Sequence, residues 1–181
     1  MKKQGVVYLC VLLMLYGCEG EEELGLLTNE IVPTKCPDLS NIEALVNAVN
    51  NARSTPRMCG STSYSAASPL KWNAKLFQAA QGHSADMAQN NFFSHTGSNG
   101  LQPSDRTKNS GYGIYSGENI GGGYESLDAA MIGWLDSPGH CANIMNPSYK
   151  DYALACVDKR HTNLGTYWTQ NFLITHNVQL S

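Results

Sequence analysis

The sequence predicts one α+β domain behind an N-terminal export signal. Four segments have the apolar spacing or the starting residues of helices, and two apolar segments near the C-terminus have the composition of strands. The chain has 181 residues, of which 42% are hydrophobic and 15% charged, which suits a single domain with its own core. A net charge of −3 without any cluster of Lys or Arg argues against nucleic-acid binding.

The first two helices are predicted from apolar stripes. The first is capped by Ser40 and ends near Arg53, and its stripe consists of Ile42, Leu45, Val46 and Val49. The second begins at Asn73 and stops at Asn90-Asn91, and its stripe consists of Leu76, Ala79, Ala80, His83 and Met87. His83 is therefore expected to be a core histidine held by a hydrogen bond. The Ser-, Gly- and Pro-rich segment between these helices is predicted as a loop.

Two further helices follow. One begins at Pro103 and ends at Gly111, and its Arg106 either serves a buried carboxylate or is solvated. The other is capped by Ser126 and carries Leu127, Ala130, Met131 and Trp134 on one face. After it, Ser137-Pro138-Gly139 is predicted as a constrained turn that positions His140.

The C-terminal part of the chain predicts a pair of strands. Residues 152–157 form a continuous apolar run, typical of a buried strand. Residues 166–173 are aromatic and β-branched and are expected to pair with the first strand across a polar turn.

The N-terminus predicts export. Lys2 and Lys3 precede an apolar stretch too short to span a bilayer, so residues 1–17 are predicted to be a signal peptide. Its end resembles a bacterial lipobox in which Cys18 carries the lipid; an ordinary signal peptide with a coincidental cysteine is the alternative. Residues 18–38 are then an acidic flexible tether, and residues 39–181 form the domain.

The expected location is the bacterial cell envelope, with a lipid anchor at Cys18. The residue after this cysteine is Glu19 and not the Asp that marks inner-membrane retention in many Gram-negative bacteria, which favours the outer membrane.

Four cysteines remain in the mature domain, an even number that favours two disulfides in an exported protein. Three pairings are open. We expect Cys36–Cys59 and Cys141–Cys156, because each of these pairs brackets one structural unit.

Four segments, in this order, resemble the successive signatures of the SCP/CAP superfamily: Phe93-Ser94-His95, Gly117-Glu118-Asn119-Ile120, Trp134-Leu135-Asp136-Ser137-Pro138-Gly139-His140 and Tyr167-Trp168-Thr169-Gln170-Asn171-Phe172. That superfamily includes cysteine-rich secretory proteins, plant pathogenesis-related proteins and bacterial exported domains. The resemblance covers about Ile42 to Leu173, and the Ser-Pro-Gly-His form is similar to the bacterial branch. It implies a three-layer α-β-α sandwich with a central antiparallel sheet.

The resemblance also implies a cleft with a His, Glu, Glu, His set that binds a divalent metal in some members. His95, Glu118 and His140 match three of the four, and Trp134 and Asn119 match residues beneath the cleft. Ser137 stands where the second Glu is found, so either it or the adjacent Asp136 is left as a fourth ligand.

Two functions of different classes follow from these residues. The favoured one is a non-catalytic, monomeric binding module for a lipid, glycan or protein, with no required cofactor; His95, Glu118 and His140 then form a hydrogen-bonded cluster. The alternative is a metal-assisted hydrolase, a protease or esterase, in which these residues hold Zn²⁺ and Glu118 acts as the base. A glutamate between Gly117 and Ile120 needs a partner in either case.

Overall fold

The structure is a computed structural model that describes residues 34–111 and 116–174, within a compact unit that spans Pro33–Ser181. The predicted signal peptide and Cys18 lie outside the described residues. The helices are α1 (Ile42–Arg53), α2 (Ala74–Gln89), α3 (Pro103–Asn109), α4 (Leu127–Asp136) and α5 (Pro138–Met145). The strands are β1 (Arg57–Cys59), β2 (Thr62–Tyr64), β3 (Lys71–Trp72), β4 (Ser116–Gly122), β5 (Asp151–Asp158) and β6 (Thr166–Leu173).

A four-stranded sheet in the order β3-β5-β6-β4 forms the middle of the domain. The three long strands are antiparallel, as expected, whereas the two-residue strand β3 runs parallel to β5. The predicted pairing of the last two strands is confirmed, with Asp151 opposite Leu173 and Asp158 opposite Thr166. Every residue of β6 is buried, because this central strand is covered on both faces.

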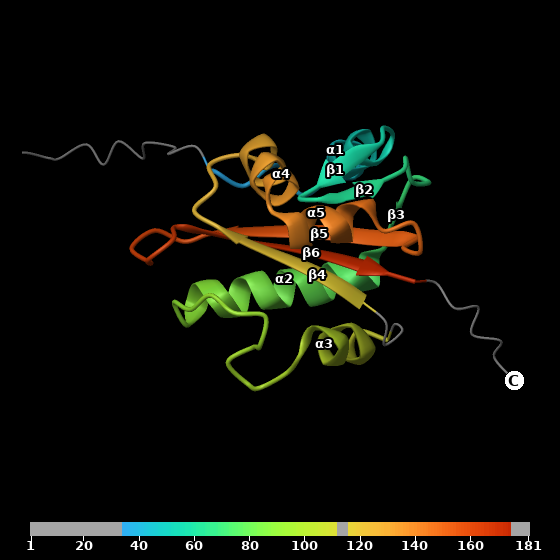
Figure 1. Cartoon of the computed structure of the whole chain (residues 1–181). Coiled ribbons are helices and arrows are strands. Elements are labelled where there is room, and N and C mark those ends of the chain that lie inside the picture. The colour runs from blue at the N-terminus through green and yellow to red at the C-terminus, as the bar shows by residue number, and fades with distance from the viewer. Residues whose placement is uncertain (1–33, 112–115, 175–181) are drawn as a thin grey trace, which may run out of the picture. The chain divides into compact units, whose positions relative to one another are not determined.

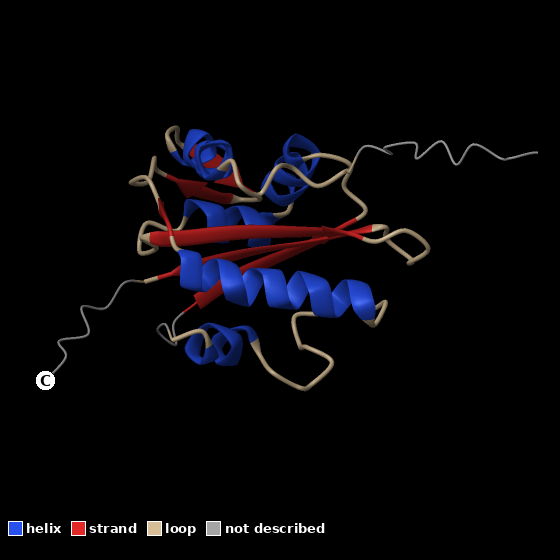
Figure 2. Cartoon of the chain, turned by 180° about the vertical axis from the view of Figure 1, so that it is seen from behind, coloured by secondary structure: helices blue, strands red, loops and turns tan. Residues whose placement is uncertain are grey.

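Helices cover both faces of the sheet, which confirms the three-layer α-β-α sandwich. The two opposite views show α2 against one face and α1, α4 and α5 on the other, while α3 lies beside α2 (Figures 1 and 2). Trp134, Trp168 and Phe172 are fully buried in the main core, between the sheet and the helices of the second layer. The sheet therefore holds the α2 layer and the α5 layer at fixed positions on either side of β4 and β6.

The four predicted helices are confirmed, with two local differences. The side chain of Asn41, not of Ser40, accepts the capping hydrogen bond of α1. The predicted turn after α4 is the start of a helix, because Pro138 occupies the first turn of α5, where the missing N–H costs nothing. His140 therefore stands on a helix.

Two structures were missed, one in the segment expected to be a loop after α1 and one in a segment for which no element was predicted. Strands β1 and β2 form a small hairpin, and β4 forms the edge of the main sheet. The Gly-rich sequence of β4 has low intrinsic strand propensity, and long-range pairing with β6 overrides it. Helix side chains also hold its backbone, since Trp134 donates from Nε1 to the carbonyl of Ile120 at 2.9 Å.

Arg53 is a fully buried cation at the end of α1. Its guanidinium donates to the carbonyls of Ser68, Ile144 and Asn146, so it joins the end of α1 to the segment before β3 and to the end of α5. These neutral acceptors satisfy the donors, as a buried guanidinium requires.

The predicted disulfide pairing is wrong. The bonds join Cys36 to Cys156 and Cys59 to Cys141, with Cα–Cα distances of 5.5 and 5.4 Å. A disulfide needs its two Cα atoms about 4.4–6.8 Å apart, and the tertiary fold decides which cysteines meet this condition. The packing of α5 against β1 brings Cys141 to the hairpin, so the residue after His140 is tied to this hairpin and not to the sheet.

The chain before α1 lies on the domain. Besides the bond from Cys36 to β5, the backbone N–H of Lys35 donates to Asp158 at 3.0 Å. The end of the predicted 18–38 tether is thus held in place from Thr34 onward. Within the described part of the chain, the helices are all too short or too polar to cross a membrane.

Candidate functional site

Glu118 lies at the centre of a buried polar cluster. It stands on β4, and its side chain is only 1% exposed. Arg106, from α3, donates from a terminal nitrogen to Oε2 of Glu118 at 2.7 Å, and the same guanidinium also donates to the carbonyls of His95 and Leu101. The prediction that Glu118 needs a partner is confirmed. Arg106 was expected either to pair with a buried carboxylate or to be solvated, and the structure shows the first.

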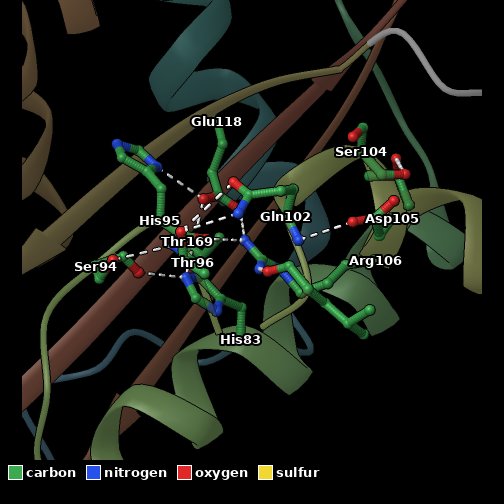
Figure 3. A network of polar contacts seen from close by, with 12 residues as sticks. His83, Ser94, His95, Thr96, Gln102, Ser104, Asp105, Arg106, Glu118 and Thr169 are labelled. Atoms are coloured by element: carbon green, nitrogen blue, oxygen red, sulfur yellow. Dashed lines mark hydrogen bonds and ion pairs between the residues drawn. The ribbon is translucent and has the colours of Figure 1, made fainter. Parts of the chain in front are cut away.

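His95 occupies the other oxygen of this carboxylate. Its Nδ1 lies 2.8 Å from Oε1 of Glu118, and its side chain is 49% exposed (Figure 3). Oε1 of the carboxylate accepts this bond, while Oε2 is paired to Arg106, so Nδ1 carries a proton and Nε2 points away from the glutamate. Glu118 therefore fixes both the orientation and the tautomer of His95.

His83 approaches the cluster from α2. It is buried, as predicted, and its Nε2 lies 2.9 Å from the carbonyl oxygen of Ser94 and 3.9 Å from Oε1 of Glu118. A carbonyl oxygen only accepts, so Nε2 is the protonated nitrogen. Burial is the main cause that lowers the pKa of His83, which keeps the imidazole neutral at pH 7.

A cleft of about 530 Å³ opens beside His95. It is lined by residues 93–95, residues 120–122 of β4, Tyr124 and His140. Phe93 is 50% exposed, so it presents an apolar ring at the cleft and does not anchor the loop in the core. The cleft thus combines two imidazoles with two aromatic rings.

His140 is positioned from beneath by Asn119. The amide of Asn119 donates to the carbonyl of His140 at 3.2 Å and to Gln170 at 3.0 Å, while Asn143 donates to Asn119 Oδ1 at 2.9 Å. Burial lowers the pKa of His140, and the neighbouring His95 adds to this effect. His140 therefore has an unprotonated ring nitrogen at neutral pH.

Tyr124, which the sequence reasoning missed, forms one wall of the cleft. A Cβ at Gly121 would lie 2.9 Å from its ring, and a Cβ at Gly133 of α4 would overlap its hydroxyl. The ring also meets Trp134 edge-on, at a centroid distance of 6.3 Å. Gly121 and Gly133 were the sequence signal that could have indicated this ring, since a glycine within a strand or helix often marks a place where another group packs closely against the backbone.

The set of metal ligands that the alternative function requires does not line the cleft together. Both oxygens of Glu118 are occupied by Arg106 and His95, and Glu118 does not line the cleft. The two candidate fourth ligands, Asp136 and Ser137, are described residues but are not part of the cleft wall either. Among the described residues, no group of three or more His, Cys, Asp or Glu side chains could hold a metal ion. A Zn²⁺ site built from three protein ligands does not fit this arrangement.

Comparison with known families agrees with the fold and with the family that the four signature segments resemble. A model of the family described as CAP, the cysteine-rich secretory protein family, matches residues 46–172, which is more than half of the chain. The chain belongs to this family. The recognition from four short motifs is thereby confirmed.

Two curated relatives of this CAP domain come from Bacillus subtilis (strain 168). The "Uncharacterized membrane protein YlbC" is 35% identical over 105 residues, which are 58% of this chain and 28% of that protein. The "Uncharacterized protein YkwD" is 31% identical over 106 residues, which are 58% of this chain and 39% of that protein. The chain thus spans less than two fifths of the length of either relative.

Solved structures show the same CAP fold. An extracellular protein containing an SCP domain from Bacillus anthracis str. Ames is 33% identical, with a TM-score of 0.55 over 60% of this chain and 35% of that one. An outer surface protein from Borrelia burgdorferi has a TM-score of 0.52 over 60% of this chain and 80% of that one; its identity is 18%, which supports the fold alone.

Proposed function

We propose that this CAP domain is a non-catalytic binding module that works outside the cytoplasm and presents the cleft between His95 and His140 to a ligand. The state of Glu118 supports this proposal most directly. Because this carboxylate is buried and both of its oxygens are engaged, it is suited to hold His95 in place and not to take a proton from a substrate or a water.

The walls of the cleft indicate the kind of ligand. Phe93 and Tyr124 offer aromatic surface, whereas His140 offers a hydrogen-bond acceptor and His95 a second imidazole. A ligand that suits these walls has an apolar body and a polar group with a donor, as lipids, glycans and peptides do. The ordered loop, strand and helix around the cleft favour a site formed before binding.

The names of the relatives support export. One solved relative, 33% identical, is an extracellular protein, and one curated relative is named a membrane protein. Combined with the signal-peptide pattern of residues 1–17, this leads us to infer export and attachment through lipid on Cys18. The outer membrane as the location, and a monomeric state, are part of the same proposal.

Replacing both His95 and His140 with Ala should weaken ligand binding at least tenfold, and neither the wild type nor the double variant should hydrolyse a peptide or an ester. Binding of a fatty acid, an oligosaccharide and a tripeptide is measured from amide shifts of the isotope-labelled mature chain. Hydrolysis is measured separately with a fluorogenic peptide and a p-nitrophenyl ester, each with and without Zn²⁺. We expect at least one probe to shift residues 93–95 and Tyr124 in the wild type, and to bind the double variant at least tenfold more weakly.

His161→Asn serves as the matched control, because His161 is an exposed histidine of the β5–β6 loop and asparagine tolerates its positive φ of 62°. Hydrolysis that requires Zn²⁺ and disappears in the double variant would instead assign a metal-assisted hydrolase. Probes that bind the double variant as tightly as the wild type would place the ligand elsewhere on the domain.

Cys18→Ser should convert the protein from a membrane-bound to a released form. The lipid chains on Cys18 supply the anchor, and two or more acyl chains give stable attachment. Fractionation of cells that express each variant gives the distribution, and mass spectrometry of the wild type gives the added lipid mass. Equal membrane retention of the two variants, without lipid on Cys18, would support the ordinary signal peptide.

A further inference from the structure

The cleft lies along an open edge of the central sheet. Strand β4 is the last in the order β3-β5-β6-β4, so β6 pairs with it on one side only (Figure 1). Residues 120–122 of this strand line the cleft, together with residues 93–95 that follow α2 and with His140 of α5. The cleft therefore passes the backbone of an edge strand, where a sheet can accept a further strand.

The register of β4 decides which of its backbone groups face away from β6. In an antiparallel pair, residues that exchange hydrogen bonds with the partner strand alternate with residues that do not. Gly123 donates to the carbonyl of Thr166 at the end of the pair, so Gly121, two residues earlier, also bonds to β6. The N–H and C=O groups of Ile120 and Gly122 therefore point away from β6.

Two side chains agree with this direction and cover part of the edge. Trp134 donates from Nε1 to the carbonyl of Ile120 at 2.9 Å. Asn143 donates to the carbonyl of Glu118, another outward-facing residue, at 3.2 Å. No hydrogen bond from the described residues reaches the outward N–H or C=O of Gly122, and this residue is partly exposed. Because glycine has no side chain, its exposed surface belongs to the backbone itself.

Two neighbouring glycines explain why this backbone is uncovered. A Cβ at Gly121 would lie 2.9 Å from the ring of Tyr124, and a Cβ at Gly122 would overlap the side chain of Leu164. Successive Cβ atoms of a strand point to opposite faces of the sheet. Tyr124 and Leu164 thus pack on the two faces of β4, which leaves its outer edge to the cleft.

The free backbone groups match an extended peptide. One residue of an antiparallel peptide can accept from the N–H of Gly122 and donate to its C=O, and the N–H of Ile120 offers a third bond. Successive side chains of the peptide point to opposite sides, so one faces residues 93–95 and the next faces Tyr124 and His140. A lipid chain lacks these donors and acceptors, and a glycan does not repeat them at the spacing of a strand.

We propose that the cleft binds an extended peptide as an added strand on the edge of β4, centred on Gly122. This inference rests on the function proposed for the cleft and names the ligand as a peptide. The backbone bonds serve any extended sequence, whereas the rings of Phe93 and Tyr124 favour apolar or aromatic side chains at neighbouring positions of the peptide.

The test compares three peptides by amide shifts of the isotope-labelled mature chain. The first is acetyl-Thr-Thr-Phe-Tyr-Thr-Thr-amide. The second carries N-methyl groups on its second and fourth residues and the third on its third and fifth, so they lose N–H groups on opposite edges of the extended peptide. We expect the unmodified peptide to bind with a Kd on the order of 1 mM or tighter. One methylated peptide should bind at least tenfold more weakly, and the other within threefold of the unmodified one.

Hydrogen exchange measures the added strand independently. The N–H of Gly122 should exchange at least tenfold more slowly when the unmodified peptide is bound. The N–H of Gly121 should change much less, because it is already bonded to β6 in the free protein.

A pair of double variants tests the donor on the protein. Gly122→Pro with Leu164→Ala removes the outward N–H and makes room for the ring, and proline is tolerated on edge strands. Gly122→Ala with Leu164→Ala is the matched control, because it makes the same room and keeps the N–H. The control should bind the unmodified peptide within threefold of the wild type, and the proline variant at least tenfold more weakly.

The outcomes separate this inference from the proposed function. Peptide binding that requires His95 and His140 but is affected equally by both sets of N-methyl groups, or by neither, would overturn the added strand and leave the binding function in place. A fatty acid or oligosaccharide that shifts residues 93–95 while the peptide shifts nothing would do the same. No shift at the cleft with any of these probes would contradict both proposals.

Discussion

Arg106→Met should lower the free energy of unfolding by about 3–5 kcal/mol, the typical cost of removing one partner of a buried ion pair. The side chain of Glu118 is 1% exposed, and Arg106 is the cation that neutralises it, at 2.7 Å. The methionine fills a similar volume but leaves the carboxylate with only the imidazoles of His83 and His95. Denaturant unfolding of the two proteins at pH 7 measures the difference.

The companion variant is Arg106→Met combined with Glu118→Leu. Removing both charges removes the uncompensated carboxylate, so the double variant should recover most of the lost stability. Lys108→Met, on the exposed side of the same helix, should change the stability by less than about 0.5 kcal/mol. If Arg106→Met is no less stable than Lys108→Met, the pair does not hold α3 to β4.

Replacing Cys59 and Cys141 together with Ala should lower the free energy of unfolding by about 4.5 kcal/mol. The disulfide closes a loop with a sequence separation of 82 residues, and the entropy of closing such a loop in the unfolded chain gives this estimate. The bond also ties the residue after His140 to the β1–β2 hairpin. The measurement is thermal or denaturant unfolding of the oxidised protein.

The same variant tests the connectivity. With Cys59 and Cys141 replaced, the pairing in the structure keeps Cys36 bonded to Cys156. The chain from Pro33 onward then has no free thiol. The pairing expected from sequence would instead leave Cys36 and Cys156 without their partners, and a thiol assay would find two. Two free thiols, or a loss of stability below about 1 kcal/mol, would contradict the structure.

The sequence alone predicted features that depend on local spacing. The apolar stripes of α1 and α2 repeat with the helical period, and the caps at Asn73 and Ser126 lie directly before their helices, so neighbouring residues carry the information. The β5–β6 pair was also predictable, because its strands are apolar, β-branched and separated by a short polar turn. Strand β4 was missed because its glycines give no local signal and its pairing with β6 is long-range.

For the candidate site, the sequence supplied the chemical groups and the tertiary structure assigned their roles. The motifs marked His95, Glu118 and His140, and the structure places the two histidines at one cleft while burying Glu118 beneath it. Which cation neutralises Glu118, which cysteine meets Cys141 and whether Asp136 faces the cleft depend on distances between segments far apart in the chain. Those distances follow from how the helices pack on the sheet, and one-dimensional spacing does not contain them.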